Sequence, residues 1–269
     1  MEAVSKGAGC DNRQGFRIRR TPFDKLRTGF DTLLHHVPQL LRMLTALHMT
    51  SYAFGRLVRM LTAILTLLAI LSASLHIRAE YYGPRYHVYV FKPLTMVFIL
   101  LMAVQAGWPD FSRYKVAIIA GLLFSLAGDV FLMLPSDRFI AGLVSFLIAH
   151  LFYIAAFTSG TGFGFSWRLL PWAIYGLFIF NILSPHLGKM KLPVLVYLVV
   201  ILVMAWQAWE RWCQTGQSTA LLAFLGAVLF VVSDSALAVN RFRGGYKSAQ
   251  ALILSTYFAA QWLIARSVG

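Results

Sequence analysis

Long apolar runs separated by short polar breaks organise most of this chain. From about residue 57 onward, each run holds roughly 16–22 residues, close to the ~20 that a helix needs to cross a ~30 Å hydrocarbon layer. The breaks carry residues that interrupt helices, such as Gly83-Pro84, Pro135-Ser136 and Gly244-Gly245. The pattern predicts an all-α, polytopic transmembrane bundle of about eight helices. The expected helices cover residues 57–78, 90–108, 116–134, 139–158, 169–184, 192–210, 219–239 and 248–266.

The first 55 residues differ from the rest of the chain. They are polar and basic as far as about Thr32, and then carry leucines at helical spacing that Pro38 interrupts. We expect residues 1–55 to be a dispensable basic extension, either disordered or the product of a start codon placed upstream of Met49 or Met60. A basic amphipathic surface helix is the alternative. Residues 56–269 are expected to form one eight-helix membrane domain.

The apolar part of the chain also repeats itself. Segment 121–129, which ends in Gly-Asp, is echoed by 226–234, which ends in Ser-Asp, and segment 153–156 is echoed by 257–260. Further matches precede these in the same order, at offsets of 100 to 112 residues. They predict a parallel four-plus-four internal repeat whose halves are related by a pseudo-twofold axis along the membrane normal. The two aspartates that end the first pair of segments should then lie at one depth and face each other.

Composition favours lipid over water as the environment. Of 269 residues, 59% are apolar and 13% charged, against roughly 45–50% and 25% in soluble domains. The formal charge of +14 would suggest nucleic acid in a soluble protein, but here Lys and Arg fill the N-terminal segment and flank the apolar runs. Such residues act as topology and headgroup signals. We expect a multi-pass membrane protein, in the inner membrane if its source is bacterial, with no nucleic-acid partner and with its oligomeric state undetermined.

The sequence leaves membrane orientation open and supports no cofactor. Loops on the expected side of the aspartates carry eight Lys and Arg and the opposite loops five, which favours a cytoplasmic position, whereas the basic N-terminal segment favours the reverse. Cys10 and Cys213 support neither a disulfide framework nor a Cys-based metal site. Phosphate loops, dinucleotide fingerprints and His-Glu-x-x-His motifs do not occur. We therefore expect no cofactor and no metal.

Two carboxylates inside apolar runs, Asp129 and Asp234, are the strongest candidates for catalysis. An ionisable group in a membrane helix is costly, faces the bundle interior and marks a function by default. Two neighbouring carboxyls in an apolar site allow one to stay protonated while its partner is ionised, which gives a general acid beside a general base. The alternative is a structural pair hydrogen-bonded to neighbouring helices.

Other polar groups in the apolar runs are candidates for substrate binding. Lys92 is expected at the membrane level of both aspartates, where it could pair with Asp129, hold a phosphate, or simply extend to the interface. His150 should lie on one helix face with Tyr153, and Tyr257 should share a face with Gln261. The set of candidates is completed by Tyr197 and Asn240. Each of these groups could instead join helices by hydrogen bonds.

The same segments resemble a known family of membrane proteins, the lysoplasmalogenase or YhhN-like family. The likeness covers about 57–266, excludes 1–55, and rests on the paired Gly-Asp and Ser-Asp motifs with His-x-x-Tyr between them. It is carried by KPLTM at 92–96, SLAGDVFLMLP at 125–135, FIAGLVSFLIAHLFYIAAF at 139–157, LGAVLFVVSDSALAVNRF at 225–242 and YFAAQWLI at 257–264. The resemblance implies cofactor-free hydrolysis of the vinyl ether bond of lysoplasmalogens, giving a fatty aldehyde and glycerophosphoethanolamine or glycerophosphocholine.

The implied chemistry suits two buried aspartates. Vinyl ethers hydrolyse by slow proton transfer to the β-carbon; a neutral carboxylic acid can supply that proton, and a second carboxylate can stabilise the oxocarbenium ion and activate water. A proton-coupled transporter is the competing interpretation, since duplicated membrane helices with buried carboxylates also suit transport. A non-catalytic lipid-binding protein is the third. The position of Lys92, Asp129 and Asp234 towards one side favours an enzyme pocket entered from one leaflet.

Overall fold

The computed structural model describes residues 54–106, 112–136 and 138–269. The chain divides into two compact units, Met1–Arg56 and Leu57–Gly269. The expected N-terminal extension, residues 1–55, lies outside the described residues except for its last two positions. The fold that positions the candidate site belongs to the second unit.

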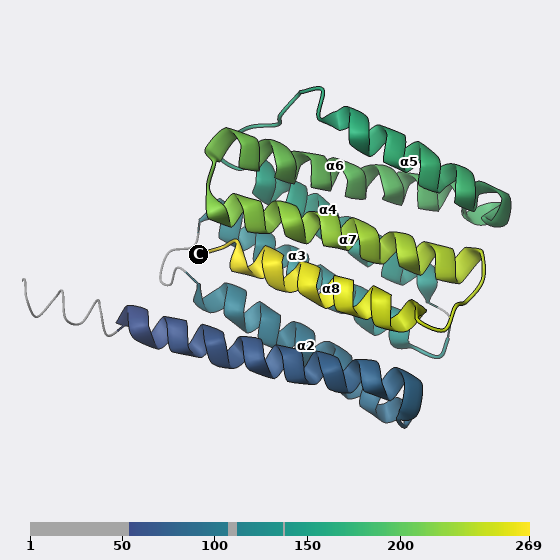
Figure 1. The fold of residues 1–269 in the computed structure, drawn as a ribbon, viewed down its shortest axis with the longest axis horizontal. Coiled ribbons are helices and arrows are strands. Elements are labelled where there is room, and N and C mark those ends of the chain that lie inside the picture. Colours follow the sequence, from purple (N-terminus) through teal and green to yellow (C-terminus); the bar gives the residue numbers. More distant parts are fainter. Residues whose placement is uncertain (1–53, 107–111, 137) are drawn as a thin grey trace, which may run out of the picture. The chain divides into compact units, whose positions relative to one another are not determined.

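Eight α-helices and no strand form within the described residues, which confirms the predicted all-α polytopic fold (Figure 1). Two single 3-10 turns, Ser184–His186 and Gly188–Met190, join the fifth helix to the sixth. The helices are Phe54–Tyr82, α2 Arg85–Gln105, α3 Arg113–Met133, α4 Phe139–Thr158, α5 Leu169–Leu183, α6 Lys191–Thr215, α7 Ser218–Phe242 and α8 Ala249–Arg266.

The described helices are built for a bilayer. Seven of the eight are long and apolar enough to span a membrane, and α8 is the exception because residues such as Gln250 and Gln261 lower its mean hydropathy. Large apolar side chains such as Leu67, Ile174 and Leu177 are exposed on the outside of the bundle. An apolar surface of this kind needs lipid around it. The chain is therefore a multi-pass membrane protein.

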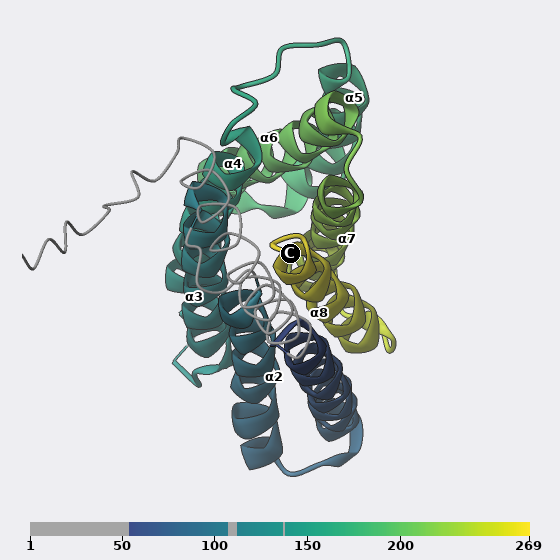
Figure 2. The same ribbon diagram turned by 90° about the vertical axis from the view of Figure 1, so that its left-hand side faces the viewer.

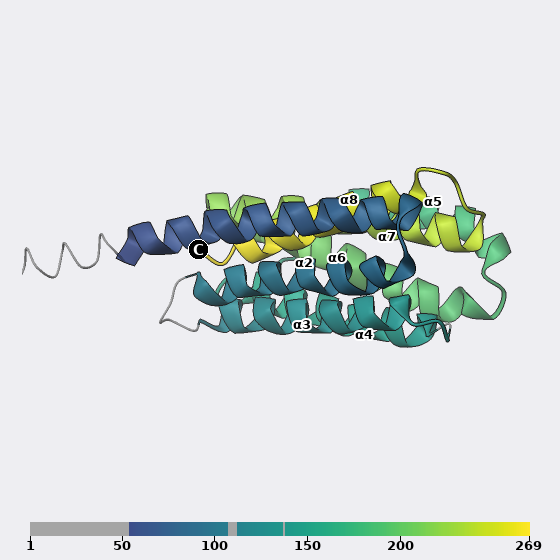
Figure 3. The same cartoon turned by 90° about the horizontal axis from the view of Figure 1, so that it is seen from below.

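The second unit has two facing pairs of helices. Seen end-on, α3 and α4 lie on one side and α7 and α8 on the other (Figure 2). Between these pairs, α2 packs on α3 and α8 at one edge, and α6 packs on α4 and α7 at the opposite edge. α5 packs on α6 and α7. Figure 3 shows α2, α3 and α4 running side by side in one layer.

The helix contacts fall into two equivalent sets. The contact of α3 with α4 corresponds to that of α7 with α8, and the contact of α2 with α3 corresponds to that of α6 with α7. Between the halves, α4 meets α6 as α8 meets α2. This is the pattern that a parallel duplication of four helices would produce. The duplication itself stays a prediction.

Glycines bring helices α3 and α7 close to their partners. A Cβ atom added at Gly121 of α3 would lie 2.3 Å from the ring of Tyr153 on α4. A Cβ atom added at Gly226 of α7 would lie 2.9 Å from the carbonyl oxygen of Ala260 on α8. Both distances are far below ordinary van der Waals contact. Glycine at these two positions therefore sets the spacing of the two helix pairs, as small residues do in membrane proteins.

The start of α2 differs from the prediction. The helix begins at Arg85 rather than near residue 90, so Pro93 lies in its interior instead of its first turn. Proline removes a backbone donor, but membrane helices tolerate it where neighbouring groups satisfy the backbone. Close to Pro93, the hydroxyl of Ser72 on the first helix donates to the Phe91 carbonyl at 3.0 Å, which ties α2 to the first helix.

The end of α6 also differs from the prediction. The predicted span ends at about residue 210, but the helix continues to Thr215. Glu210 does not end the span, because it is buried and its carboxylate is fully partnered. It accepts hydrogen bonds from the Trp206 indole and from the Arg168 guanidinium, both at 2.9 Å, and from the Ser166 hydroxyl. A charge that is paired and hydrogen-bonded in this way can lie within a membrane helix.

Gly226→Ala should destabilise the bundle, because the new Cβ would meet the α8 backbone, which cannot rotate away as a side chain can. We expect a loss of ~1–3 kcal/mol in the free energy of unfolding, the usual cost of overpacking. The measurement is the thermal midpoint of the detergent-purified protein. Gly55→Ala is the control, because no heavy atom lies within 4 Å of its added Cβ. Equal midpoints for Gly226→Ala and the wild type would contradict the close approach of α7 to α8.

Candidate active site

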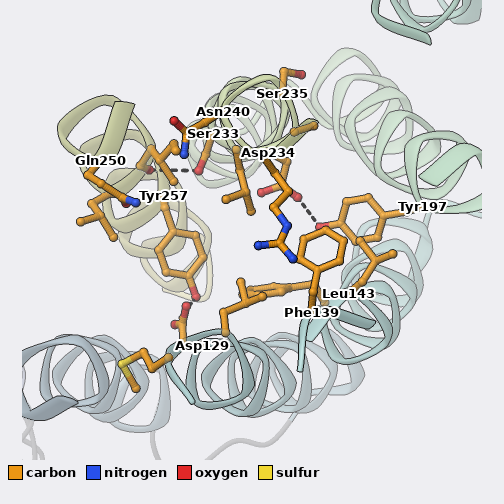
Figure 4. A pocket seen from close by; sticks show the side chains of 18 of the residues that line it. Asp129, Phe139, Leu143, Tyr197, Ser233, Asp234, Ser235, Asn240, Gln250 and Tyr257 are labelled. Carbon is orange, nitrogen blue, oxygen red and sulfur yellow. Dashed lines mark hydrogen bonds between the residues drawn. The ribbon is translucent and has the colours of Figure 1, made fainter. Parts of the chain in front are cut away.

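A cavity of about 700 Å³ lies at the end of the bundle where α3 and α7 finish and α4 and α8 begin. Its volume is within the ~300–1,000 Å³ range of small-molecule sites. In Figure 4, Asp129 on α3 and Asp234 on α7 enter it from different walls. The two aspartates that the sequence singled out therefore share one cavity.

Asp129 is almost completely buried, with 1% of its side chain exposed. Its Oδ1 lies 3.0 Å from the Nζ of Lys92 on α2. Its Oδ2 accepts a hydrogen bond of 2.6 Å from the hydroxyl of Tyr257 on α8. A buried carboxylate needs an opposite charge and hydrogen-bond donors to offset its lost hydration. The partners of Asp129 thus join three helices at the cavity wall.

Asp234 is more open to the cavity, with 14% of its side chain exposed. Its Oδ2 accepts a hydrogen bond from the hydroxyl of Tyr197 on α6. The Nε2 of His150 on α4 lies 3.0 Å from the Tyr197 hydroxyl oxygen and 3.7 Å from the Asp234 carboxylate. His150 itself is fully buried. A chain of polar groups therefore runs from His150 through Tyr197 to Asp234.

The two carboxylates are held in corresponding ways. Asp129 is contacted from α2, which precedes its own helix, and from α8 of the other half. Asp234 is contacted from α6, which precedes its own helix, and from α4 of the other half. The partner chemistry differs, since Asp129 has a lysine and Asp234 a tyrosine backed by a histidine. The two acids occupy equivalent positions but have different electrostatic surroundings.

The structure brings most of the sequence-predicted site residues to this cavity. Its lining includes Lys92, Asp129, Tyr197, Asp234, Asn240 and Tyr257. His150, Tyr153 and Gln261 lie behind that lining, where the Tyr153 hydroxyl donates to the Gln261 side-chain carbonyl at 2.7 Å. Of the two possible partners considered for Lys92, the carboxylate of Asp129 is the one that it contacts. The catalytic and binding roles of these residues stay proposals.

Sequence reasoning missed several charged residues of the cavity. Glu80, Arg85, Arg138 and Arg241 also contribute to the lining. In the sequence they stand at helix ends, where charge is usually a topology signal. Their position along the bundle was the available clue. All four residues stand at helix ends on the side of the bundle where the aspartates are.

One wall of the cavity is apolar. It is formed by side chains of α5 and α6, namely Ile179, Leu183, Val194, Leu198 and Ile201. The charged groups come instead from the first helix, α2, α3, α4 and α7. The cavity is therefore amphipathic, which suits a ligand with a polar end and a hydrocarbon end.

The side chains facing the cavity are suited to proton transfer and to the stabilisation of charge. Carboxylates, phenols and cations make up its polar lining. Within the described residues, no group of three or more His, Cys, Asp and Glu side chains is arranged to hold a metal ion. A carboxyl pair flanking a bound molecule is a recurring arrangement for acid–base hydrolysis.

Fold and site together define a polytopic α-helical membrane protein with two carboxylates in one amphipathic cavity. Within that class, the chain belongs to the YhhN family, whose profile matches residues 87–268. It is 35% identical over 199 residues to the membrane protein YhhN of Escherichia coli O157:H7, covering 74% of this chain and 95% of that protein.

Other relatives carry an enzyme name. The human lysoplasmalogenase TMEM86A is 33% identical over 180 residues, which cover 65% of this chain and 74% of the human protein. The human lysoplasmalogenase TMEM86B is 34% identical over 164 residues, which cover 57% of this chain and 64% of that protein. No solved structure matches the chain significantly.

Lys92→Met should destabilise the protein, because it leaves the Asp129 carboxylate buried without its cation. Breaking a buried pair in this way costs ~3–5 kcal/mol. The double variant Lys92→Met/Asp129→Asn should regain much of that loss, since the charge itself is removed. Thermal midpoints of the purified variants measure both effects.

The matched control for this comparison is Lys189→Met, because Lys189 is exposed in the connection between α5 and α6. Its midpoint should stay at the wild-type value. A Lys92→Met protein as stable as the wild type, with no gain in the double variant, would show that the ion pair does not hold the cavity together.

Proposed function

We propose that this protein is a lysoplasmalogenase, which hydrolyses the vinyl ether bond of a lysoplasmalogen to a fatty aldehyde and glycerophosphoethanolamine or glycerophosphocholine. The observation that carries the proposal is the pair Asp129 and Asp234, which line one amphipathic cavity. Human relatives named lysoplasmalogenase, at 33% and 34% identity, support the same activity. The reaction needs a proton donor, a stabilised cation and water, and these require no cofactor.

Asp234 is the proposed proton donor. Its carboxyl contacts the Tyr197 hydroxyl and lies near the His150 ring, and part of its side chain is open to the cavity. In the first step its proton passes to the β-carbon of the vinyl ether. The π electrons of the double bond form the new C–H bond, and a lone pair of the ether oxygen stabilises the cation left at the α-carbon as an oxocarbenium ion. A carboxylic acid that faces the substrate can deliver its proton to carbon in this step.

Asp129 is the proposed anionic partner. The ammonium of Lys92 and the hydroxyl of Tyr257 both stabilise a carboxylate here. A fixed negative charge beside the oxocarbenium ion lowers the energy of the transition state in which that positive charge develops. The two acids therefore take different parts because their partners differ, not because their positions do.

Water completes the reaction. The carboxylate left on Asp234 takes a proton from water as the water oxygen bonds to the oxocarbenium carbon, which restores the acid and gives a hemiacetal. The hemiacetal then loses the glycerol oxygen, which receives the proton of the hemiacetal hydroxyl, and the aldehyde is released. The apolar wall from α5 and α6 would hold the hydrocarbon chain during these steps.

A proton-coupled transporter is the second candidate, favoured by the two equivalent sets of helix contacts. Transport needs a polar path open in turn to both sides of the membrane. Here Lys92 and both aspartates belong to a cavity at one end of the bundle. At the other end, segment 159–168 is bonded to α6 through Gln207 and Glu210. This asymmetry favours an enzyme.

Asp129→Asn and Asp234→Asn should each lower the rate of aldehyde release by ~10²–10⁴-fold, the usual loss on removing general acid–base catalysis. Asparagine keeps the size of the side chain but can neither give a proton to carbon nor carry the negative charge. The assay uses purified protein and lysoplasmenylethanolamine, with the saturated alkyl-ether analogue as a substrate that this chemistry cannot cleave. Near-normal turnover by both variants would eliminate the two-carboxylate mechanism and move the transporter ahead.

Aldehyde release by the wild type should slow in D₂O, because the proposed slow step transfers a proton to carbon. The measurement compares kcat in H₂O and D₂O at matched acidity, with added glycerol as a control for solvent viscosity. Equal kcat values in the two solvents would place the slow step elsewhere, at water attack on a preformed cation or at product release.

A further inference from the structure

Lys92, one of whose possible roles was to hold a phosphate, is engaged inside the cavity. The ammonium of Lys92 lies 3.0 Å from the Asp129 carboxylate, and only 13% of its side chain is exposed. If Lys92 moved to a phosphate, Asp129 would be left buried and unpaired, which is costly. The headgroup of a lysophospholipid therefore needs a different cation.

Two arginines line the cavity where it opens to the outside, since both are exposed. Arg138, at the start of α4, and Arg241, near the end of α7, line both the main cavity and a neighbouring hollow of about 450 Å³. The guanidinium carbon of Arg241 lies 5.1 Å from the centre of the Phe139 ring, and the Nε of Arg138 donates to the Ser136 hydroxyl at 3.2 Å. These contacts orient both guanidinium groups, whose planar donors match a phosphate in bidentate fashion.

The spacing along α7 fits a glycerophospholipid. Asp234 and Arg241 lie two helical turns apart and both line the cavity, which gives a rise of ~10 Å between their Cα atoms. In a lysoplasmalogen, the glycerol unit separates the vinyl ether from the phosphate. With the ether beside the carboxylates, the phosphate lies nearer the opening, within reach of a long arginine side chain from α7.

We propose that Arg138 and Arg241 form the phosphate site of the cavity and bind the phosphodiester headgroup of the lysophospholipid. The identity of the lipid rests on the proposed function. Binding of the headgroup does not require hydrolysis. The neighbouring hollow gives the substituent of the phosphate, ethanolamine or choline, a place outside the main cavity.

The test is a binding titration with the full chain and a saturated 1-alkyl lysophosphatidylethanolamine, which has the headgroup but no double bond to protonate. Arg138→Gln and Arg241→Gln should each weaken its binding about tenfold, because each removes a charge-assisted hydrogen-bond donor set. Binding of 1-alkylglycerol, which lacks the phosphate, should not change. Thermal midpoints confirm that each variant is folded, and Arg241→Lys, which keeps the charge, should fall between wild type and Arg241→Gln.

Arg243→Gln is the matched control, because Arg243 is exposed two residues further along, at the C-cap of α7, and lines neither hollow. It should bind the lysophospholipid as the wild type does. If Arg243→Gln binds the lysophospholipid as weakly as the other two variants do, general surface charge explains the effect and the site is overturned. If Arg138→Gln and Arg241→Gln also lose affinity for 1-alkylglycerol, altered packing explains it and the site is overturned. Wild-type affinity in both Arg138→Gln and Arg241→Gln would equally overturn the site.

A free phosphate could use the same chemistry, so inorganic phosphate is a separate arm of the titration. It lacks the hydrocarbon chain and should displace the lysophospholipid only at high concentration. Displacement as effective as that by unlabelled lipid would overturn the assignment to a lipid headgroup.

The binding and hydrolysis measurements together separate the phosphate site from the proposed function. If the arginine variants lose binding while the wild type releases no aldehyde, the phosphate site stands and the hydrolase does not.

Discussion

The enclosure of two carboxylates among membrane helices, one buried and one partly buried, is the constraint on which the rest of this structure depends. In a low-dielectric interior a carboxylate needs a cation or several donors, and neither aspartate obtains all of its partners from its own helix. Asp129 takes Lys92 from α2 and Tyr257 from α8, while Asp234 takes Tyr197 from α6 and faces His150 on α4. The requirement therefore ties together helices of both halves at one level of the bundle, and the cavity is the space that these ties leave between α3 and α7.

Not every buried acid in this protein marks a site for chemistry. Glu210 is buried as deeply, but Ser166, Arg168 and Trp206 surround its carboxylate, and it does not line the cavity. Its effect is structural, since it holds segment 159–168 against α6. The two aspartates differ from Glu210 because they keep access to a space large enough for a ligand. Access to the cavity, and not burial alone, is what makes the two aspartates candidates for chemistry.

Much of this arrangement could be predicted from the sequence. The period and length of apolar runs indicated every helix, and an ionisable residue inside such a run directed attention to Asp129, Asp234 and Lys92. Helix ends were less predictable. α2 includes Pro93 in its interior and α6 continues beyond Glu210, because tertiary partners override the local tendency of a proline or a charge to end a helix. Arg138 and Arg241 were missed for a related reason, since a basic residue at a helix end looks the same in sequence whether it faces lipid headgroups or a cavity. The structure distinguishes the two, because it places both side chains in the lining of the cavity.

The polarity of the cavity suits an amphiphilic ligand. Charged side chains gather at the opening, the two acids lie further in, and the wall from α5 and α6 is apolar. A lysophospholipid carries its groups in the same order, with the phosphate first, the ether next to the glycerol, and the hydrocarbon last. α5 is mostly exposed and packs chiefly on α6, with the Tyr175 hydroxyl donating to Ser235 of α7 at 2.8 Å. The α5 part of the apolar wall thus belongs to a helix on the outside of the described bundle, where a hydrocarbon chain of a bound ligand would stay in an apolar medium.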